Sequence, residues 1–187
     1  MNGLDALRVT ARARPEASLS LQFDPAEIPA LAARYEYEDD SECVRAGAHA
    51  AARGYYTRGE LRAVCAWKTA RAKRKVAANS FHRVRAASGR ALADQTDDWP
   101  RIQALCELLG VGVPTASVLL HFAFPDRYPI IDYRALESLG VPKPSTYSAT
   151  VWLGYAAACR EIAGENRVPL RVLDKALWQH SKEHGGA

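Results

Sequence analysis

The chain has 187 residues, of which 48% are hydrophobic, and a formal net charge of +4 at pH 7. This size suits one compact domain or two small interlocked lobes, and the apolar content excludes a wholly disordered chain. No apolar run approaches the roughly 20 residues that cross a bilayer, and the N-terminal sequence lacks the apolar segment of a secretion signal, so we expect no membrane partner.

Helix signals run through the first half of the chain. Asp24-Pro25 is a good helix start, and Ser80 is a good N-cap. Thr57 and Glu60 have the spacing of a capping box, and Gly54 marks a helix end. We predict helices over residues 24–37, 41–53, 57–67, 70–79 and 80–92. The one candidate strand is the segment LSLQF at 19–23.

The second half is predicted to be helical as well. One helix begins at Asp97 or Asp98 and runs through Leu109, and a nearly all-apolar helix follows from Thr115 to Phe124. Three more are expected over residues 133–139, over 147–163 and after Pro169. Strand patterning is almost absent elsewhere, so the sequence predicts an all-α fold.

Charge is distributed unevenly along the sequence. Ten basic residues and one acid lie between Arg58 and Arg90, whereas five acids lie between Glu36 and Glu42. This asymmetry is typical of a polyanion-binding surface with a repelling flank, although a solvated helix face would have the same composition. The candidate phosphate-binding side chains are those of Lys68, Arg71, Lys73, Arg74 and Lys75.

The segment from Leu109 to Ala116 reads LGVGVPTA and indicates a tight turn between two helices. Gly110 and Gly112 flank Val111 and let the chain reverse without Cβ clashes. With a helix expected to begin at Thr115, free N–H groups at its N-terminus favour a phosphate anion. Asp132 follows Gly112 by 20 positions, just after the apolar helix.

This pattern resembles the helix-hairpin-helix DNA glycosylase superfamily. The match covers residues 105–140: Leu-x-Gly-Val-Gly-x-x-Thr-Ala, an apolar helix, then Ile-Ile-Asp and Arg134. The resemblance implies two interlocked helical lobes, residues 41–127 and residues 1–40 with 128–187. It also implies that Asp132 is the catalytic acid and that double-stranded DNA is the partner. The main-chain carbonyls of Cys106, Leu108 and Val111 would then hold a monovalent cation.

Three departures from the family pattern limit which of the family's activities we expect. Pro114 stands where bifunctional members have a Schiff-base lysine, so lyase chemistry through that position is excluded. Leu109 replaces the usual hairpin proline. The family's C-terminal four-cysteine cluster is missing, and the four cysteines present lie far apart, so we expect no iron–sulfur cluster. We therefore predict a DNA N-glycosylase of the monofunctional type in base-excision repair, located in the bacterial cytosol or nucleoid.

Several residues have two interpretations at this stage. Asp132 suits catalysis but would also cap the helix that follows it. Tyr55 and Tyr56 would stack on an extruded base or anchor a loop in the core. Lys68 would act as a nucleophile or contact phosphate, and His121 is expected to be a satisfied core histidine. The alternative functions are an inactive DNA-binding module and a helical protein-interaction domain.

Overall fold

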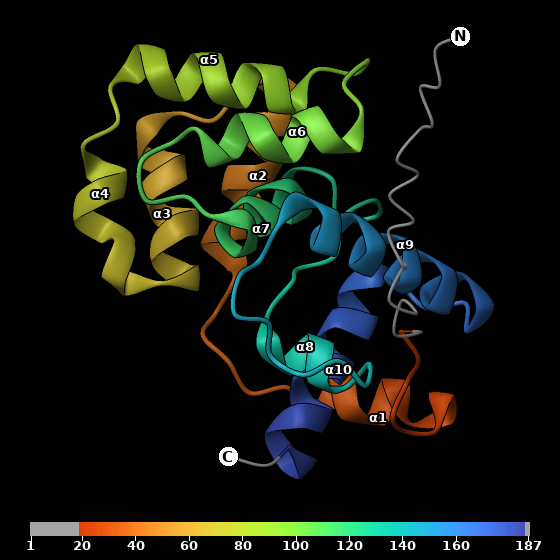
Figure 1. Cartoon of the computed structure of the whole chain (residues 1–187). Helices are drawn as coiled ribbons and strands as arrows, with labels where there is room; N and C mark the ends of the chain where they lie inside the picture. Colours follow the sequence, from red (N-terminus) through yellow and green to blue (C-terminus); the bar gives the residue numbers. More distant parts are fainter. Residues whose placement is uncertain (1–18, 186–187) are drawn as a thin grey trace, which may run out of the picture.

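A computed structural model describes residues 19–185, and this part of the chain is all-helical with no strands (Figure 1). The N-terminal half contains two short 3₁₀ helices and five α-helices: η1 (Pro25–Glu27), α1 (Ile28–Ala33), α2 (Ser41–Arg53), α3 (Arg58–Lys68), η2 (Ala70–Ala72), α4 (Lys73–Ala77) and α5 (Phe81–Leu92). The remaining helices are α6 (Asp98–Cys106), α7 (Val113–Ala123), α8 (Tyr133–Glu137), α9 (Ala149–Glu165) and α10 (Leu170–His184). The all-α prediction is confirmed for this range.

Local capping accounts for several helix ends. The Thr57 hydroxyl accepts a hydrogen bond from the Glu60 N–H, and the Glu60 carboxylate accepts one from the Thr57 N–H, which is the predicted capping box. The Ser80 hydroxyl caps α5 in the same way by accepting from the Arg83 N–H. Helix α2 ends at Gly54, whose φ of +84° is the left-handed conformation that favours glycine.

Some predicted boundaries are wrong. The first helix ends at Ala33 rather than near Tyr37, because the following residues are extended and place aromatic rings against α3 and α10. The segment 19–23 is not a strand; it makes two backbone hydrogen bonds to the end of α8, from Ser20 N–H to Leu139 O and from Gln22 N–H to Ser138 O. The predicted helix at 70–79 is split into η2 and α4.

Helix α7 lies at the centre of the fold and is buried over almost its whole length, as its apolar sequence predicts. It packs against α2, α3 and α6, whereas α10 packs against α1, α8 and α9. The buried apolar residues form one continuous cluster that includes members of both predicted lobes. The division into residues 41–127 and 1–40 with 128–187 therefore stays a prediction.

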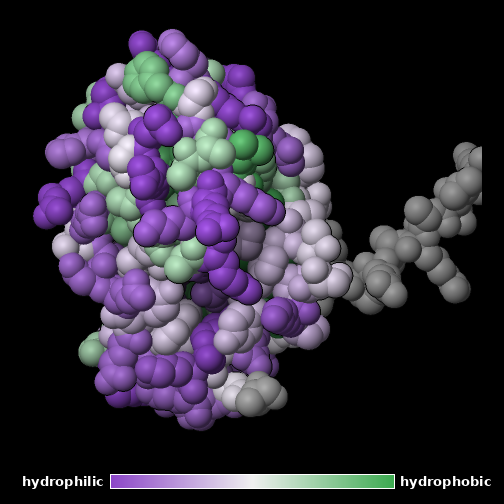
Figure 2. Space-filling model, turned by 90° about the vertical axis from the view of Figure 1, so that its left-hand side faces the viewer, coloured by the Kyte–Doolittle hydropathy of each residue, from purple (hydrophilic) through white to green (hydrophobic). Residues whose placement is uncertain are grey.

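Among the residues that the structure describes, no helix is long and apolar enough to span a bilayer. Figure 2 shows the face that carries α4, and most of this face is hydrophilic with small apolar patches between the polar side chains.

Candidate functional site

The chain turns between α6 and α7 through the hairpin residues 107–112. Gly110 has a φ of +80°, and a Cβ at this position would lie 2.9 Å from Lys75 Cβ and 3.1 Å from the Val76 nitrogen. The turn is therefore packed directly on α4. The buried Asn79 side chain fixes it there, because its amide nitrogen donates to Leu109 O at 3.0 Å and its amide oxygen accepts from the Leu109 N–H at 2.9 Å.

Gly112 lies in a different environment from Gly110. Its φ is −102° and it is exposed, and a Cβ added to it would come no closer than 3.9 Å to any described atom beyond its two chain neighbours. Neither backbone strain nor internal packing requires glycine here. Gly112 is the N-cap of α7, which begins at Val113 rather than at Thr115, and no described side chain caps this helix. In the first turn of α7, Val113 and Thr115 are buried, Pro114 has no N–H, and the Ala116 N–H donates to Gly112 O at 2.8 Å. The exposed main chain of Gly112 is therefore the part of this helix start that an external anion can reach.

Four of the predicted phosphate-binding residues follow one another in the segment 71–75, whose end packs on this hairpin. Arg71 belongs to η2 and the other three to α4, and all four side chains are exposed: Arg71, Lys73, Arg74 and Lys75. Arg74 and Lys75 line a hollow whose other wall is formed by the hairpin residues 107–111. The fold therefore joins a basic segment to a hairpin that follows it by some 35 positions, on the hydrophilic face of Figure 2.

Thr115, the predicted start of this helix, is buried and offers little surface to an external phosphate. The Leu108 carbonyl, one of the three predicted cation ligands with those of Cys106 and Val111, accepts a hydrogen bond from the Val111 N–H at 3.1 Å. A carbonyl oxygen has a second lone pair, so this bond leaves room for a cation. The cation site stays a prediction.

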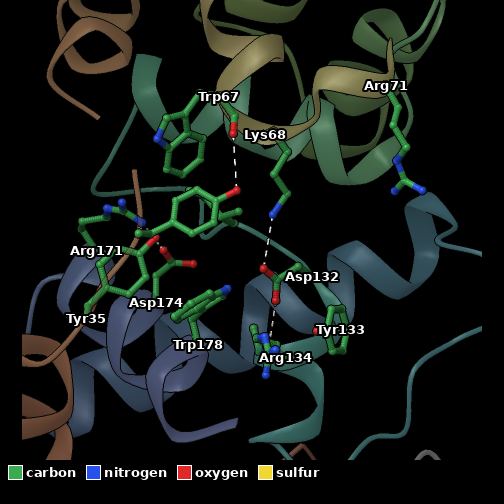
Figure 3. Close-up of a pocket in the computed structure, with 13 residues that line it drawn as sticks. Tyr35, Trp67, Lys68, Arg71, Asp132, Tyr133, Arg134, Arg171, Asp174 and Trp178 are labelled. Carbon is green, nitrogen blue, oxygen red and sulfur yellow. Dashed lines mark hydrogen bonds and ion pairs between the residues drawn. The ribbon is translucent and has the colours of Figure 1, made fainter. Parts of the chain in front are cut away.

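Asp132 is the N-cap of α8, and its two carboxylate oxygens have different partners (Figure 3). Oδ1 accepts a hydrogen bond from the Ala135 N–H at 2.9 Å, whereas Oδ2 lies 3.3 Å from Lys68 Nζ. The Asp132 and Lys68 side chains are 21% and 15% exposed. The capping bond fixes the direction of the carboxylate, so capping and a role at the pocket surface are compatible.

The pocket around this pair has a volume of about 370 Å³, which is in the range of small-molecule sites. Lys68 and Arg71 enter it from the α3 side, and Asp132 from the α8 side (Figure 3). Arg71 lies three positions before Arg74, which lines the hollow beside the hairpin, so the exposed cations of this segment extend from the hairpin to the pocket. Asp132 is tied to α7 as well, since the neighbouring Ile131 N–H donates to the Ser117 hydroxyl at 3.1 Å.

Aromatic rings form much of the pocket wall. Tyr37 meets Trp67 edge-on at a centroid distance of 5.1 Å and Trp178 at 5.6 Å, and Tyr35 meets Trp178 at 5.2 Å. These rings come from the extended connection before α2, from α3 and from α10. Sequence reasoning missed this cluster, because the local pattern places Tyr35 and Tyr37 in a helix and Trp178 lies more than 140 positions further along the chain.

A second carboxyl group lines the pocket deeper in the protein. Asp174 on α10 is buried and forms an ion pair with Arg171, which also binds Asp40 at 2.5 Å. Burial raises the pKa of Asp174 to about 6, although the Arg171 guanidinium opposes this shift. Asp40 belongs to the acidic segment that the sequence predicts as a repelling flank. Asp40 pairs with Arg171, and Glu36 pairs with Lys182. The acidic segment therefore also binds α10.

The two candidate base-stacking tyrosines have different positions. Tyr56 is fully buried, and its hydroxyl donates to Leu119 O at 2.7 Å, so the stacking assignment for Tyr56 is wrong and the core-anchor interpretation holds. Tyr55 is half-buried, with the guanidinium groups of Arg53 and Arg85 each 4.9 Å from its ring centroid. Its ring therefore already has two cationic partners.

Three histidines pack against other groups of the protein. His121 is buried with Nδ1 2.7 Å from Tyr128 O, and burial lowers its pKa to about 4, as expected for a neutral core histidine. His180 and His184 stack with ring centroids 4.9 Å apart. Within residues 19–185, no three His, Cys, Asp or Glu side chains are placed to hold a metal ion. All four cysteines are free thiols.

Comparisons of this chain with family models, with curated proteins and with solved structures find no match. The case for a function therefore depends on the hairpin, the basic surface and the pocket described above.

Proposed function

We propose that this protein binds double-stranded DNA across the hairpin and α4, and that it hydrolyses the N-glycosidic bond of a nucleotide flipped into the pocket. The observation that carries the proposal is the position of Asp132. One of its oxygens is held by the N-terminus of α8, while the other faces a pocket that the exposed Arg71 also lines.

The DNA-binding part follows from the hairpin. Phosphate contacts to main-chain N–H groups and to lysine and arginine side chains hold a duplex without reading its sequence. Gly112 supports this role, because an exposed glycine with no internal need for a missing Cβ permits close approach of a ligand to the backbone. The exposed side chains of Lys73, Arg74 and Lys75 add positive charge next to it.

The chemical part follows from the pocket. An enzyme that acts on a base within a duplex must extrude the nucleotide, and aromatic walls stabilise the extruded base by stacking. As the base leaves, positive charge develops on the sugar, and a fixed carboxylate beside it lowers the barrier electrostatically. Asp132 fills this role in the proposal, with Trp178 and Tyr37 as stacking surfaces. We extend the proposal to a helix-hairpin-helix fold of two interlocked lobes.

A panel of duplexes, each with one damaged or mismatched base, tests the proposal. Alkaline cleavage of the resulting abasic sites reports base release, and fluorescence anisotropy at several salt concentrations reports DNA affinity. Wild-type protein should release at least one base of the panel. Asp132→Asn should reduce release by about 10²-fold or more, in line with the loss of one electrostatic stabiliser, and keep the affinity within about twofold. Asparagine preserves the cap, so the fold is unchanged.

A second candidate function is that of a DNA-binding module without chemistry, and one observation favours it: Asp132 Oδ2 is already paired with Lys68. This candidate predicts salt-dependent DNA binding with no base release from any member of the panel. A helical protein-interaction domain predicts no salt-dependent binding at all.

A further inference from the structure

The two carboxyl groups that line the pocket differ in how their oxygens are partnered. Both oxygens of Asp132 have a partner, Oδ1 in the Ala135 N–H and Oδ2 in Lys68. Asp174 uses Oδ2 for its ion pair with Arg171, whereas its Oδ1 accepts no hydrogen bond from any residue in the described range 19–185. The Asp174 side chain is 8% exposed and lines the pocket, and Figure 3 shows its carboxyl directed from α10 toward the pocket interior. A ligand in the pocket can therefore reach this oxygen.

The charge around Asp174 favours a ligand that donates hydrogen bonds. The Arg171 guanidinium is shared, because it donates both to Asp174 Oδ2 and to Asp40 Oδ2. Its position is fixed by the rings of Tyr35 and Trp67, whose centroids lie 5.4 and 5.8 Å away. One cation thus serves two carboxylates, and negative charge is left over on the pocket side. A hydrogen bond to a charged acceptor of this kind is stronger than one between neutral groups.

We infer that Asp174 determines which bases the pocket accepts, because its Oδ1 accepts a hydrogen bond from an exocyclic amino group of the base. The substrate class is then that of bases which keep this amino group, derived from adenine, guanine or cytosine. Deaminated bases, such as hypoxanthine and uracil, are rejected. This inference rests on the proposed entry of an extruded base into the pocket.

Deamination of adenine or cytosine replaces the amino donor by a carbonyl acceptor. A carbonyl oxygen in that place would face the Asp174 carboxylate, and two acceptors repel each other. The ring N–H of hypoxanthine or uracil lies next to a carbonyl oxygen, so an approach through this N–H also brings an acceptor close to the carboxylate. A site built to bind an N–H group rejects an analogue without it, because the buried acceptor then stays unpaired.

Calorimetric titration of the full-length protein with free nucleotides tests this inference without DNA. Deoxyadenosine monophosphate is compared with deoxyinosine monophosphate, and deoxycytidine monophosphate with deoxyuridine monophosphate. Deoxyguanosine monophosphate is also compared with the inosine nucleotide, from which it differs by its 2-amino group. The sugar and the phosphate are the same in each pair, so the ratio of the two affinities reports the base, and the three comparisons identify which base the pocket prefers.

At pH 7.5, wild-type protein should bind the amino nucleotide of at least one pair about tenfold more tightly or better, which is the effect of one hydrogen bond to a charged group. Asp174→Asn should bring this ratio to within about twofold of one, because an amide both donates and accepts. The matched control is Asp94→Asn, at an exposed acid between α5 and α6 that does not line the pocket, and it should keep the wild-type ratio.

A pH series on wild-type protein tests the same group without a substitution, in case Asp174→Asn folds poorly. Burial raises the pKa of Asp174 to about 6, so its carboxyl is mostly ionised at pH 7.5 and mostly protonated at pH 5. A protonated carboxyl donates as well as accepts, so the affinity ratio should fall about threefold or more at pH 5.

Other groups around Asp174 do not provide this change. The titratable and charged groups that face it are Arg171 of its own helix with Asp40, Asp132 before α8, Lys68 of α3, Tyr35 of the connection before α2, and Tyr155 and Cys159 of α9. Burial raises the pKa values of Tyr35, Tyr155 and Cys159, so these three stay neutral over the series. The nucleotide phosphate titrates equally in both members of a pair, so its effect cancels in the ratio.

Equal affinities within every pair, tighter binding of the deaminated members, or no measurable binding of any nucleotide would overturn the inference. An unchanged ratio in well-folded Asp174→Asn, or in wild type at pH 5, would overturn it as well. The proposed function fails in a different way. Release of uracil or hypoxanthine from duplex DNA would support the glycosylase and contradict this inference, whereas amino-selective nucleotide binding without any base release would contradict the glycosylase and leave the role of Asp174 intact.

Discussion

The two hairpin glycines provide a matched pair of substitutions, because only one of them is required by the fold. Gly110→Ala forces a side chain into the left-handed region and places its Cβ 2.9 Å from Lys75 Cβ. The conformational term is about 1–2 kcal/mol, and an overpacked contact adds roughly 1–3 kcal/mol. We therefore expect Gly110→Ala to lower the free energy of unfolding by about 2–5 kcal/mol.

Gly112→Ala should preserve the stability of the protein and weaken its binding to DNA. Its φ of −102° suits alanine and its surroundings are open, so the free energy of unfolding should change by no more than about 0.5 kcal/mol. If a phosphate binds the first turn of α7, the added methyl group pushes it away. Loss of one hydrogen bond to a charged group costs roughly 1.5–3 kcal/mol, which corresponds to about 10- to 100-fold weaker DNA binding.

Urea unfolding and fluorescence anisotropy on a short duplex measure the two effects separately. Unchanged DNA affinity for a well-folded Gly112→Ala would refute phosphate binding by the hairpin. Unchanged stability for Gly110→Ala would refute the packing of the hairpin on α4.

Three further predictions concern the basic surface, the core and the cap. The double variant Arg74→Ala with Lys75→Ala should reduce the slope of log affinity against log salt by about 2, whereas Arg167→Gln should leave it unchanged. Arg167 is an exposed residue of the connection after α9, and the end of α9 lies on the opposite side of the molecule from α4 (Figure 1). Equal slopes for the two variants would count against DNA binding by α4. The pKa of His121 is lowered to about 4 in the folded protein, against about 6.5 in the unfolded chain. Folding with a neutral His121 therefore carries no penalty above pH 6.5, and the free energy of unfolding decreases as the pH falls from 6.5 toward 4. Between pH 7.5 and pH 5, the free energy of unfolding of wild type should fall by about 2 kcal/mol more than that of His121→Asn. Equal losses for the two proteins in urea unfolding would contradict this. Asp132→Ala should lower the free energy of unfolding by about 1 kcal/mol through loss of the α8 cap, whereas Asp132→Asn should not, and equal unfolding midpoints for the two variants would argue against the cap.

Local signals predicted the helices and their caps well. The capping box at Thr57, the N-cap at Ser80 and the glycine end at Gly54 depend on residues within a few positions of each other, so the sequence contains all the information they need. The buried helix α7 was equally clear, because an apolar run of that length has no amphipathic alternative.

Long-range contacts explain what was missed. The helix predicted to reach Tyr37 ends at Ala33 because Tyr37 packs on Trp67 and Trp178, and these rings lie 30 and 141 positions away in the sequence. Tyr56 has the local context of an exposed turn residue, yet its hydroxyl bonds to α7.

In the candidate site, too, features that depend on neighbouring residues were predictable and those that depend on long-range contacts were not. The hairpin and Asp132 were found from their spacing, because the residues themselves define the turn and the cap. The Lys68–Asp132 pair, the aromatic wall and the buried Arg171–Asp174 pair all lie in one pocket built from segments that are far apart in the sequence. Only the folded chain brings these side chains together.

The most direct test of the central claim is to measure free bases released from duplex DNA that has been alkylated, oxidised or deaminated. Mass spectrometry of the supernatant should identify at least one modified base that accumulates with wild-type protein, and Asp132→Asn at equal DNA occupancy should release it about 10²-fold more slowly or slower still. No released base with bound wild-type protein, or equal release by the two proteins, would contradict the account.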